Sequence, residues 1–384
     1  MSEHTNFQNL GLSDSILKGI YTYGFKDPSK IQIKGIKAIL SKKDSIVQSQ
    51  SGTGKTATYL LSILNMVNVN IKTPQAIIIS PTRELAIQIN DVAENLAKYT
   101  DINVSLTIGG SDFKTNINDI KKSQVIIATI GRINHVYQYF KNTKSKTLNN
   151  VNMLIFDEAD NILENDITDE IQSILSNQNE NCQKILISAT LTKNVFNYAE
   201  KYMNTPHKIL LKREEIAVDL ISQFYVDSEI EENKFDVMMD LYSMISTTQA
   251  IIFCNTIRKL NWLEKELEKN NFTITCIHGQ MSQEERNEVV KDFRSGKTRI
   301  LLTTDLLARG IDIPQVNLVM NYDLPLNKET YIHRIGRCGR FGKKGVSISL
   351  VNFQDYNDKK HFKFLKNHYK IKINEMPNNI NEYI

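Results

Sequence analysis

Short apolar runs alternate with longer amphipathic segments along the first half of the chain. The runs are rich in isoleucine, leucine and valine, and they lie at 45–50, 76–80, 104–109, 125–129, 153–157, 184–188 and 207–211. Between them apolar residues recur with helical spacing, as in RELAIQINDVAENLAKY at 83–99. Near-continuous apolar strands joined by helices are typical of a parallel sheet that helices cover on both faces.

The same alternation resumes in the second half of the chain. Its apolar runs lie at 222–226, 250–255, 273–278, 299–304, 318–323 and 346–351. Two such successions predict an α/β protein with two tandem doubly wound parallel-sheet domains, and a single large sheet is the alternative. A strand pattern ends in a charged run within LLKREEIAVDL, Leu210 to Leu220. We therefore expect an N-terminal domain at 1–210, a short linker at 211–220 and a C-terminal domain at 221–384.

Composition and charge limit the class of protein. The chain has 384 residues, of which 41% are hydrophobic and 23% charged, so it can build ordinary cores and is not globally disordered. Its net charge is only +4, so binding to nucleic acid would need a local basic track rather than bulk attraction.

Cysteine spacing and the N-terminal segment indicate the compartment. The four cysteines are far apart and form no C-x-x-C pair, which disfavours a zinc site or a disulfide framework and fits a reducing compartment. The N-terminus has no basic region followed by an apolar run, and no apolar run approaches the ~18 residues of a membrane span. We expect a soluble intracellular protein with no membrane segment.

A phosphate-binding loop is predicted at SQSGTGKT, Ser49 to Thr56, between a strand and a helix-like segment. Backbone N–H groups of a glycine-rich turn can surround phosphate oxygens, while Lys55 supplies charge and Thr56 a hydroxyl for Mg²⁺. The general pattern has glycine where this chain has Ser49, and a plain glycine turn is the alternative. The nucleotide-binding residues expected in this loop are Gly52, Thr53, Gly54, Lys55 and Thr56.

Acidic residues follow the strand MLIFD in the segment MLIFDEAD, Met153 to Asp160. Ligands of parallel sheets bind at the carboxyl ends of the strands. We expect Asp157 to hold Mg²⁺, mainly through water, and Glu158 to orient or deprotonate the attacking water. An N-cap cluster that begins the next helix is the alternative interpretation of these acids.

The chain resembles the DEAD-box RNA helicase family when these motifs are taken together with three others. They are PTRELA at Pro81–Ala86, SAT at Ser188–Thr190 and HRIGRCGR at His333–Arg340. Their order and spacing match the family from about Phe7 to the end, and within it the chain most resembles translation initiation factor 4A. The resemblance implies two RecA-like domains joined by a short linker, and an RNA-dependent ATPase that uses ATP and Mg²⁺.

Further nucleotide contacts follow from the resemblance. Phe25 is expected to stack on adenine, and the amide of Gln32 to pair with it. Asp312 is expected to face the ribose. Arg337 and Arg340 match the family's arginine fingers, which act on the γ-phosphate from the other domain. Ser188, Thr190 and His333 are expected to couple the domains.

RNA contacts are also implied by the resemblance, on both domains. The expected residues are Arg83, Gly110, Thr129 and Arg132 in the first domain, and Asn255, Gly279, Arg286 and Thr304 in the second. Glycine permits close approach of a sugar-phosphate strand, and contacts to phosphate carry little sequence information. One departure is Ile130, which stands where the family usually has proline.

The expected function is RNA-stimulated ATP hydrolysis coupled to local, non-processive unwinding of RNA duplexes or remodelling of RNA–protein particles, in translation initiation. The expected partners are single-stranded RNA, bound without sequence specificity, and regulatory proteins of the initiation-scaffold type. A monomer in the cytoplasm is expected, with the nucleus as the alternative location. The rival functions are an ATP-gated RNA clamp in mRNA processing or ribosome assembly and, more remotely, a DNA translocase.

Overall fold

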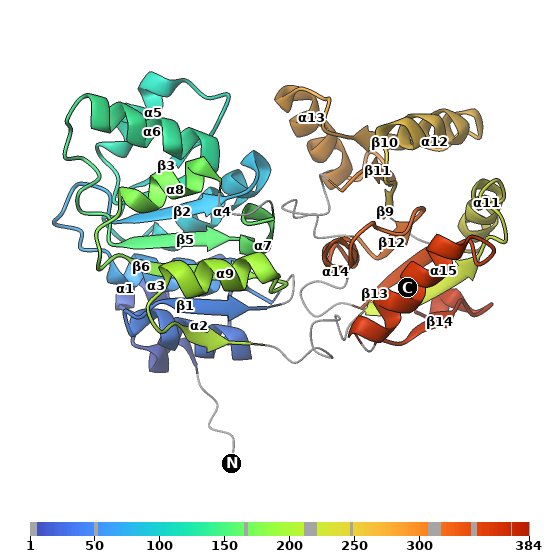
Figure 1. The fold of residues 1–384 in the computed structure, drawn as a ribbon, viewed down its shortest axis with the longest axis horizontal. Helices are drawn as coiled ribbons and strands as arrows, with labels where there is room; N and C mark the ends of the chain where they lie inside the picture. Colours follow the sequence, from blue (N-terminus) through green and yellow to red (C-terminus); the bar gives the residue numbers. More distant parts are fainter. Residues whose placement is uncertain are drawn as a thin grey trace, which may run out of the picture. The chain divides into compact units, whose positions relative to one another are not determined.

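The protein is described by a computed structural model that covers residues 6–49, 53–164, 168–210, 221–245, 249–305, 316–338, 344–369 and 371–383. The described residues form two compact units, one before residue 211 and one after residue 220. The expected linker at 211–220 lies outside the described residues. Each unit contains one parallel sheet with its own helices (Figure 1).

The sheet of the first unit has seven strands in the order β3-β4-β2-β5-β6-β1-β7, and neighbouring strands pair in parallel. Parallel strands all begin at the same edge of the sheet, so the chain must return to that edge between strands through a crossover connection, usually a helix. The strands are β1 (Ser45–Gln48), β2 (Ala76–Ser80), β3 (Val104–Thr107), β4 (Val125–Thr129), β5 (Met153–Asp157), β6 (Gln183–Ser188) and β7 (His207–Ile209).

Helices cover both faces of this sheet because the strands are apolar on both sides. Ile46 of β1 packs with one group of helices and Val47 with the other, as alternation along a strand requires. One face carries η1 (Phe7–Leu10), α1 (Asp14–Tyr23), α2 (Lys30–Leu40), α3 (Lys55–Met66) and α4 (Arg83–Ala97). The opposite face carries α5 (Phe113–Ile120), α6 (Ile130–Asn142), α7 (Ala159–Ile162), α8 (Asp169–Ser176) and α9 (Lys193–Tyr202).

The sheet of the second unit also has seven parallel strands, in the order β10-β11-β9-β12-β13-β8-β14. The strands are β8 (Ile221–Asp227), β9 (Ala250–Phe253), β10 (Ile274–Ile277), β11 (Ile300–Thr303), β12 (Leu318–Asn321), β13 (Gly345–Val351) and β14 (Ile373–Glu375). One face packs against α13 (Gln283–Arg294), α14 (Lys328–Ile335) and α15 (Tyr356–Tyr369). The other packs against α11 (Lys234–Met244), α12 (Ile257–Lys269) and η2 (Ile380–Glu382).

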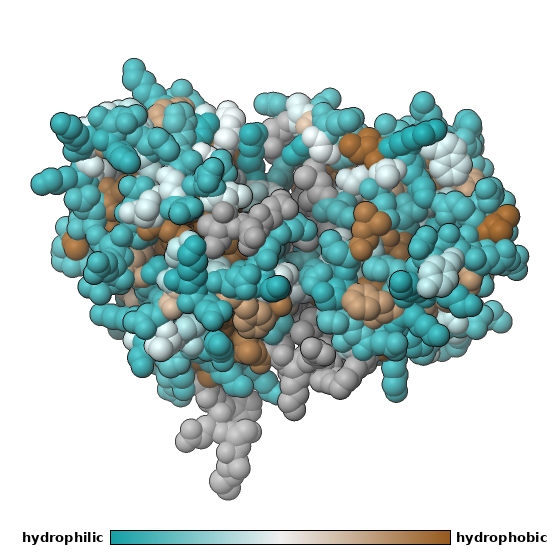
Figure 2. Space-filling view, in the orientation of Figure 1, coloured by the Kyte–Doolittle hydropathy of each residue, from teal (hydrophilic) through white to brown (hydrophobic). Residues whose placement is uncertain are grey.

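Two parallel sheets with helices on both faces confirm the predicted fold class. The loop that follows each strand often ends in a side-chain cap for the next helix. Thr82 caps α4 by accepting from Leu85 N–H, and Asp112 caps α5 by accepting from Thr115 N–H. The surface drawn in Figure 2 is largely hydrophilic on both units. Among the described residues, no helix is long and apolar enough to span a membrane.

Candidate active site

The described part of the phosphate loop runs from the end of β1 into the first turn of α3. Gly54 is the N-cap of α3 and has a φ of 90°, a left-handed conformation that favours glycine. A Cβ at this position would lie 2.5 Å from Gln32 Nε2, so the space is also filled. Conformation and packing therefore both require glycine directly before Lys55.

Ser49, the departure from the general pattern, has a structural role. Its hydroxyl makes a hydrogen bond with the Thr53 hydroxyl, and its backbone N–H donates to Ser188 O at 3.0 Å. The Ser29 hydroxyl donates to Thr53 O at 3.0 Å. These bonds fix the two described ends of the loop to β6 and to the start of α2. Gly52, predicted to bind phosphate, lies outside the described residues.

Gln32 lies beside the phosphate loop and is nearly buried. The side-chain oxygen of Gln32 accepts from Ser29 N–H at 2.8 Å, and the backbone N–H of Gln32 donates to Ser29 Oγ at 3.3 Å, so the two residues form a capping box. A carbonyl oxygen keeps a second lone pair after this bond. Phe25 is half-buried near Phe7 and Tyr23. Adenine contacts by Gln32 and Phe25 stay predictions.

Asp157 lies at the end of β5 and is held through both carboxylate oxygens. Oδ1 accepts from Glu158 N–H at 2.9 Å and Oδ2 accepts from the Tyr59 hydroxyl at 2.8 Å. Burial and the Glu158 carboxylate raise the pKa of Asp157 to about 6, while Lys55 and the Tyr59 hydrogen bond act in the opposite direction. The sequence pattern assigned Tyr59 no role, because an aromatic residue in an apolar stretch of α3 is typical of core.

Glu158 follows in the left-handed conformation, with a φ of 52°. Such a backbone is strained for a non-glycine residue and is often found at functional sites. The side chain is nearly buried, and among the described residues no donor reaches its Oε2 atom. Two adjacent carboxylates, one of which has a buried oxygen without a partner among the described residues, are suited to bind a divalent cation and its coordinated water. The alternative of a simple N-cap cluster is not supported, because Glu158 makes no side-chain cap bond to α7.

Asp160, the last acid of the DEAD motif, links β5 to the SAT motif. Its Oδ2 accepts from the Thr190 hydroxyl and from Thr190 N–H, and its own N–H donates to Ser188 Oγ at 3.3 Å. The Ser188 hydroxyl in turn donates to Thr190 O at 2.6 Å. The structure thus connects Ser188 and Thr190, two of the three residues predicted to couple the domains, with an acid to which the sequence pattern assigned no role. The feature of the sequence that points to this role of Asp160 is that it is the third carboxylate after a buried strand.

Three of the predicted RNA contacts of the first unit lie around one turn, at 109–111. Arg83 starts α4, and a Cβ on Gly109 would lie 2.8 Å from its Nη2 atom. A Cβ on Gly110, whose φ is 90°, would lie 3.0 Å from Nη1. The Arg83 guanidinium thus lies against both glycines, and the expected close approach of a sugar-phosphate strand to this turn stays a prediction.

Arg132 also contacts the turn at 109–111. Its Nη2 donates to Ser111 O at 2.9 Å, and its guanidinium lies 5.6 Å from the centre of the Phe113 ring. Thr129 ends β4 and is the N-cap residue of α6, without a side-chain cap bond. Ile130, the departure from proline, is the first residue of that helix. Arg83, Gly110, Thr129 and Arg132 therefore share the carboxyl edge of β2, β3 and β4.

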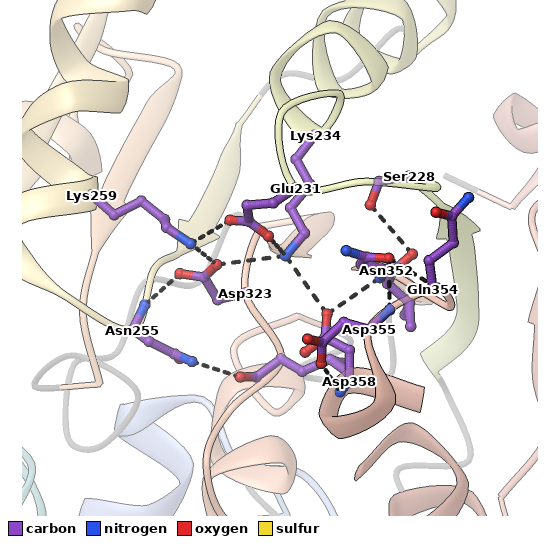
Figure 3. Close-up of polar contacts among 12 residues, drawn as sticks. Ser228, Glu231, Lys234, Asn255, Lys259, Asp323, Asn352, Gln354, Asp355 and Asp358 are labelled. Atoms are coloured by element: carbon purple, nitrogen blue, oxygen red, sulfur yellow. Dashed lines mark hydrogen bonds and ion pairs between the residues drawn. The ribbon is translucent and has the colours of Figure 1, made fainter. Parts of the chain in front are cut away.

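In the second unit three hydrogen bonds hold Asn255, and Figure 3 draws the one to Asp323. Its backbone N–H donates to Asp323 Oδ2 at 2.9 Å and its Nδ2 to Leu324 O at 2.8 Å. Its Oδ1 accepts from Arg334 Nη2 at 2.7 Å. The side-chain amide is thus used within the unit, and an RNA contact by Asn255 stays a prediction.

Arg334 on α14 is the largest fully buried side chain among the described residues. Besides Asn255, it donates from Nε to Asp305 Oδ1 at 2.6 Å and from Nη1 to Asp323 O at 2.7 Å. It therefore joins the loops after β9, β11 and β12 to the helix that carries His333. We assigned roles only to its neighbours in HRIGRCGR, because one arginine in a basic run carries no sign of burial.

A partly buried cluster of charges anchors Asp323 (Figure 3). Lys259 Nζ lies 2.6 Å from Asp323 Oδ1 and 2.6 Å from Glu231 Oε1. Lys234, whose side chain is 3% exposed, lies 2.7 Å from Glu231 and 3.7 Å and 3.8 Å from Asp323 and Asp358. Because the buried Lys234 and the partly exposed Lys259 each lie near more than one carboxylate, the loop that holds Asn255 is fixed in place.

Of the remaining predicted residues of the second unit, Gly279 and Thr304 follow strands, Arg286 and His333 lie on α13 and α14, and Arg337 follows α14. Arg286 Nη2 donates to Gly279 O at 2.8 Å, which brings these two together, and Thr304 directly follows β11. Arg337 Nε donates to His333 O at 3.2 Å. Arg340 and Asp312 lie outside the described residues.

Comparison with known proteins adds the family. The model described as DEAD/DEAH box helicase matches residues 29–198, and that of the helicase conserved C-terminal domain matches residues 233–342. The ATP-dependent RNA helicase FAL1 of Candida albicans is 44% identical over 380 residues, which are 99% of this chain and 94% of that protein. FAL1 of Saccharomyces cerevisiae strain S288c is 44% identical over 382 residues, covering 98% and 94%.

Solved structures agree with these sequence matches. S. cerevisiae Dbp5 bound to RNA and ADP BeF3 superposes with a TM-score of 0.87 at 36% identity, covering 97% of this chain and 96% of that one. Mss116p bound to ssRNA and AMP-PNP gives a TM-score of 0.85 at 28% identity, covering 98% and 80%. The two sheets are therefore those of tandem RecA-like domains. Matched over nearly its whole length at this identity, the chain belongs to the DEAD-box family of ATP-dependent RNA helicases.

Proposed function

We propose that this ATP-dependent RNA helicase hydrolyses ATP with the groups at the carboxyl edge of β1 and β5, and uses the energy for local, non-processive unwinding of RNA or remodelling of RNA–protein particles. The observation that carries the proposal is the pair Asp157 and Glu158 at the end of β5. One acid is held through both oxygens, and the other has a buried oxygen without a partner among the described residues.

On the nucleotide side, Lys55 and the N-terminus of α3 bind phosphate oxygens, and Gln32 and Phe25 bind adenine. Thr56 and Asp157 would hold Mg²⁺, Asp157 mainly through water, and the ion neutralises developing phosphate charge when bound. Glu158 orients the attacking water and accepts its proton at the carboxylate. Asp312, Arg337 and Arg340 complete the site from the second domain.

On the RNA side, the turn at 109–111 with Arg83 and Arg132 binds the sugar-phosphate backbone in the first domain. Asn255, Gly279, Arg286 and Thr304 do the same in the second. Contacts to phosphate and 2′-hydroxyl groups favour RNA over DNA and ignore sequence. Because ATP and RNA both bridge the two domains, each ligand raises the affinity for the other. Ser188, Thr190 and His333 transmit this coupling.

Substitution of Glu158 by glutamine tests the proposal. Glu158→Gln keeps the size of the side chain but removes the base, so we expect RNA-stimulated hydrolysis to fall by about 10²-fold or more with ATP binding retained. Steady-state ATPase and equilibrium nucleotide binding give the two quantities. The control is Glu200→Gln, an exposed glutamate on α9.

Three outcomes separate the candidates. Undiminished hydrolysis by Glu158→Gln contradicts its role as base. A wild-type protein that closes on RNA with ATP but does not turn over favours the ATP-gated clamp. Equal stimulation by RNA and DNA of one sequence favours the DNA translocase.

For the cellular process two candidates are kept. The resemblance to factor 4A favours translation initiation, and ribosome assembly is the alternative. The names of the relatives described above give an RNA helicase and no process, so they do not support the expected role as an initiation factor. Co-sedimentation of the tagged protein with initiation complexes or with ribosome precursors separates the two, and the co-purified proteins identify its regulatory partners.

A further inference from the structure

Tyr59 is a core residue whose hydroxyl reaches the candidate catalytic edge. The side chain is fully buried and its ring packs with the apolar face formed by α1 to α4. A buried hydroxyl is costly without a hydrogen-bond partner. Its partner here is Asp157 Oδ2, at 2.8 Å.

A second contact joins the same hydroxyl to the phosphate loop. Tyr59 lies three residues after Thr56 on α3, a spacing that places two side chains on one helix face. The Thr56 side chain makes a hydrogen bond with the Tyr59 hydroxyl. Tyr59 therefore connects Thr56 and Asp157, the two residues that would hold Mg²⁺ under the proposed function.

The Asp157 carboxylate has one protein donor on each oxygen: Glu158 N–H on Oδ1 and the Tyr59 hydroxyl on Oδ2. Rotation about the last side-chain bond would break both hydrogen bonds. Each oxygen keeps further lone pairs for water or a cation. A phenol is suited to this position because it is a neutral donor, whereas an ammonium or guanidinium group would repel a divalent cation.

We propose that Tyr59 is a positioning residue that orients Asp157, together with Thr56, for the binding of Mg²⁺–nucleotide. The inference rests on the proposed function of this edge and adds a third residue to it. The opposing interpretation is that the Tyr59 hydroxyl only satisfies a buried acid and supports folding.

The two interpretations differ in how they depend on Mg²⁺. Tyr59→Phe in the full-length chain removes one oxygen atom and keeps the ring. Loss of a group that hydrogen-bonds a metal-binding carboxylate costs about 10–100-fold in metal affinity. We expect the Mg²⁺ concentration for half-maximal binding of a fluorescent ADP analogue to rise about tenfold. Binding of the analogue in excess EDTA should stay within about twofold of wild type, because the ring and the loop are unchanged.

Tyr198→Phe is the matched control. Tyr198 is also fully buried in the first unit, and its ring packs on Phe156, the neighbour of Asp157, at a centroid distance of 5.4 Å. Its hydroxyl has no hydrogen-bond partner among the described residues. Tyr198→Phe should leave both the Mg²⁺ midpoint and the EDTA affinity unchanged.

Two results overturn the inference. One is a Mg²⁺ midpoint for Tyr59→Phe within about twofold of wild type, against the tenfold expected. The other is an equal loss of affinity with Mg²⁺ and in EDTA, which shows a general structural role. Failure of the wild-type protein to bind the analogue under either condition is a different result, because it contradicts the proposed nucleotide site itself.

Discussion

Asp157 is a buried acid next to a second acid, and its protonation is linked to the stability of the fold. Burial raises its pKa to about 6, above the ordinary value for aspartate. The folded state therefore binds this proton more tightly than the unfolded chain does. Its contribution to the free energy of unfolding falls as the pH rises from about 4 to about 6 and stays low above that. Under the proposed function, a bound cation would offset this cost.

Asp157→Asn should therefore stabilise the protein without ligand while it weakens Mg²⁺-dependent nucleotide binding. At pH 7.5 we expect the free energy of unfolding of the first unit to rise, with an upper limit of about 3 kcal/mol from the size of the pKa shift. The gain should disappear as the pH falls towards about 4. Urea denaturation between about pH 4 and pH 8 measures it. Asp101→Asn, an exposed aspartate, is the control, and an Asp157→Asn protein no more stable than wild type contradicts the argument.

At the scale of elements, the strand–loop–helix around Gly54 shows what kind of constraint acts on the site. The left-handed φ of Gly54 and its contact with Gln32 both come from the way β1, α2 and α3 meet. Gly296 also has a left-handed φ, of 76°, but no atom lies within 4 Å of the position its Cβ would take. The two glycines share the backbone constraint and differ in the packing constraint.

Gly54→Ala and Gly296→Ala separate these two constraints. Both should lose about 1–2 kcal/mol of stability, because alanine is strained in the left-handed region. Only Gly54→Ala should also lose nucleotide affinity, since its methyl group displaces Gln32. Thermal unfolding and nucleotide titration of both variants measure the effects. Equal nucleotide affinity in the two variants would show that the Gln32 contact is unimportant.

Most strands could be predicted from the sequence because buried parallel strands are apolar on both sides. β2, β4 and β5 begin and end where the apolar runs do. β14 was missed, since it is three residues long at a sheet edge and only Ile373 is buried. The order of the strands could not be predicted either, because pairing depends on helix packing between distant segments.

The site could be predicted where chemistry is local in the sequence, as in Lys55 with Thr56 and Asp157 with Glu158. It could not where partners lie far apart. Tyr59 and Asp157 are separated by 98 positions, and Arg334 and Asn255 by 79. An aromatic residue in an apolar helix and an arginine in a basic run carry no sign of these partners. Buried polar networks therefore become visible only in three dimensions.

At the scale of the whole molecule, each unit has its own sheet with a core on both faces. The first unit holds the described part of the phosphate loop and both acids, and the second holds Arg337. This division fits the proposal that the catalytic groups are shared between two independently folded domains.

Residues 1–210 alone should fold and bind nucleotide but hydrolyse ATP poorly. Arginine fingers contribute about 10³–10⁵ in rate in other nucleotide hydrolases, so we expect a loss of about 10³-fold or more with RNA present. Circular dichroism establishes folding, and steady-state ATPase with and without RNA measures turnover. If the fragment hydrolyses ATP as fast as the full chain, the second domain supplies no catalytic group.

The contact between Gln32 and Gly54 has a consequence for engineering and for evolution. The residue expected to read the base lies against the residue that shapes the phosphate loop. Replacement of Gln32 to accept another nucleobase would thus also remove the side chain that packs against Gly54 in the phosphate loop. Under the proposed function, base preference and phosphate binding are therefore linked, and substitutions at the two positions should arise as compensating pairs.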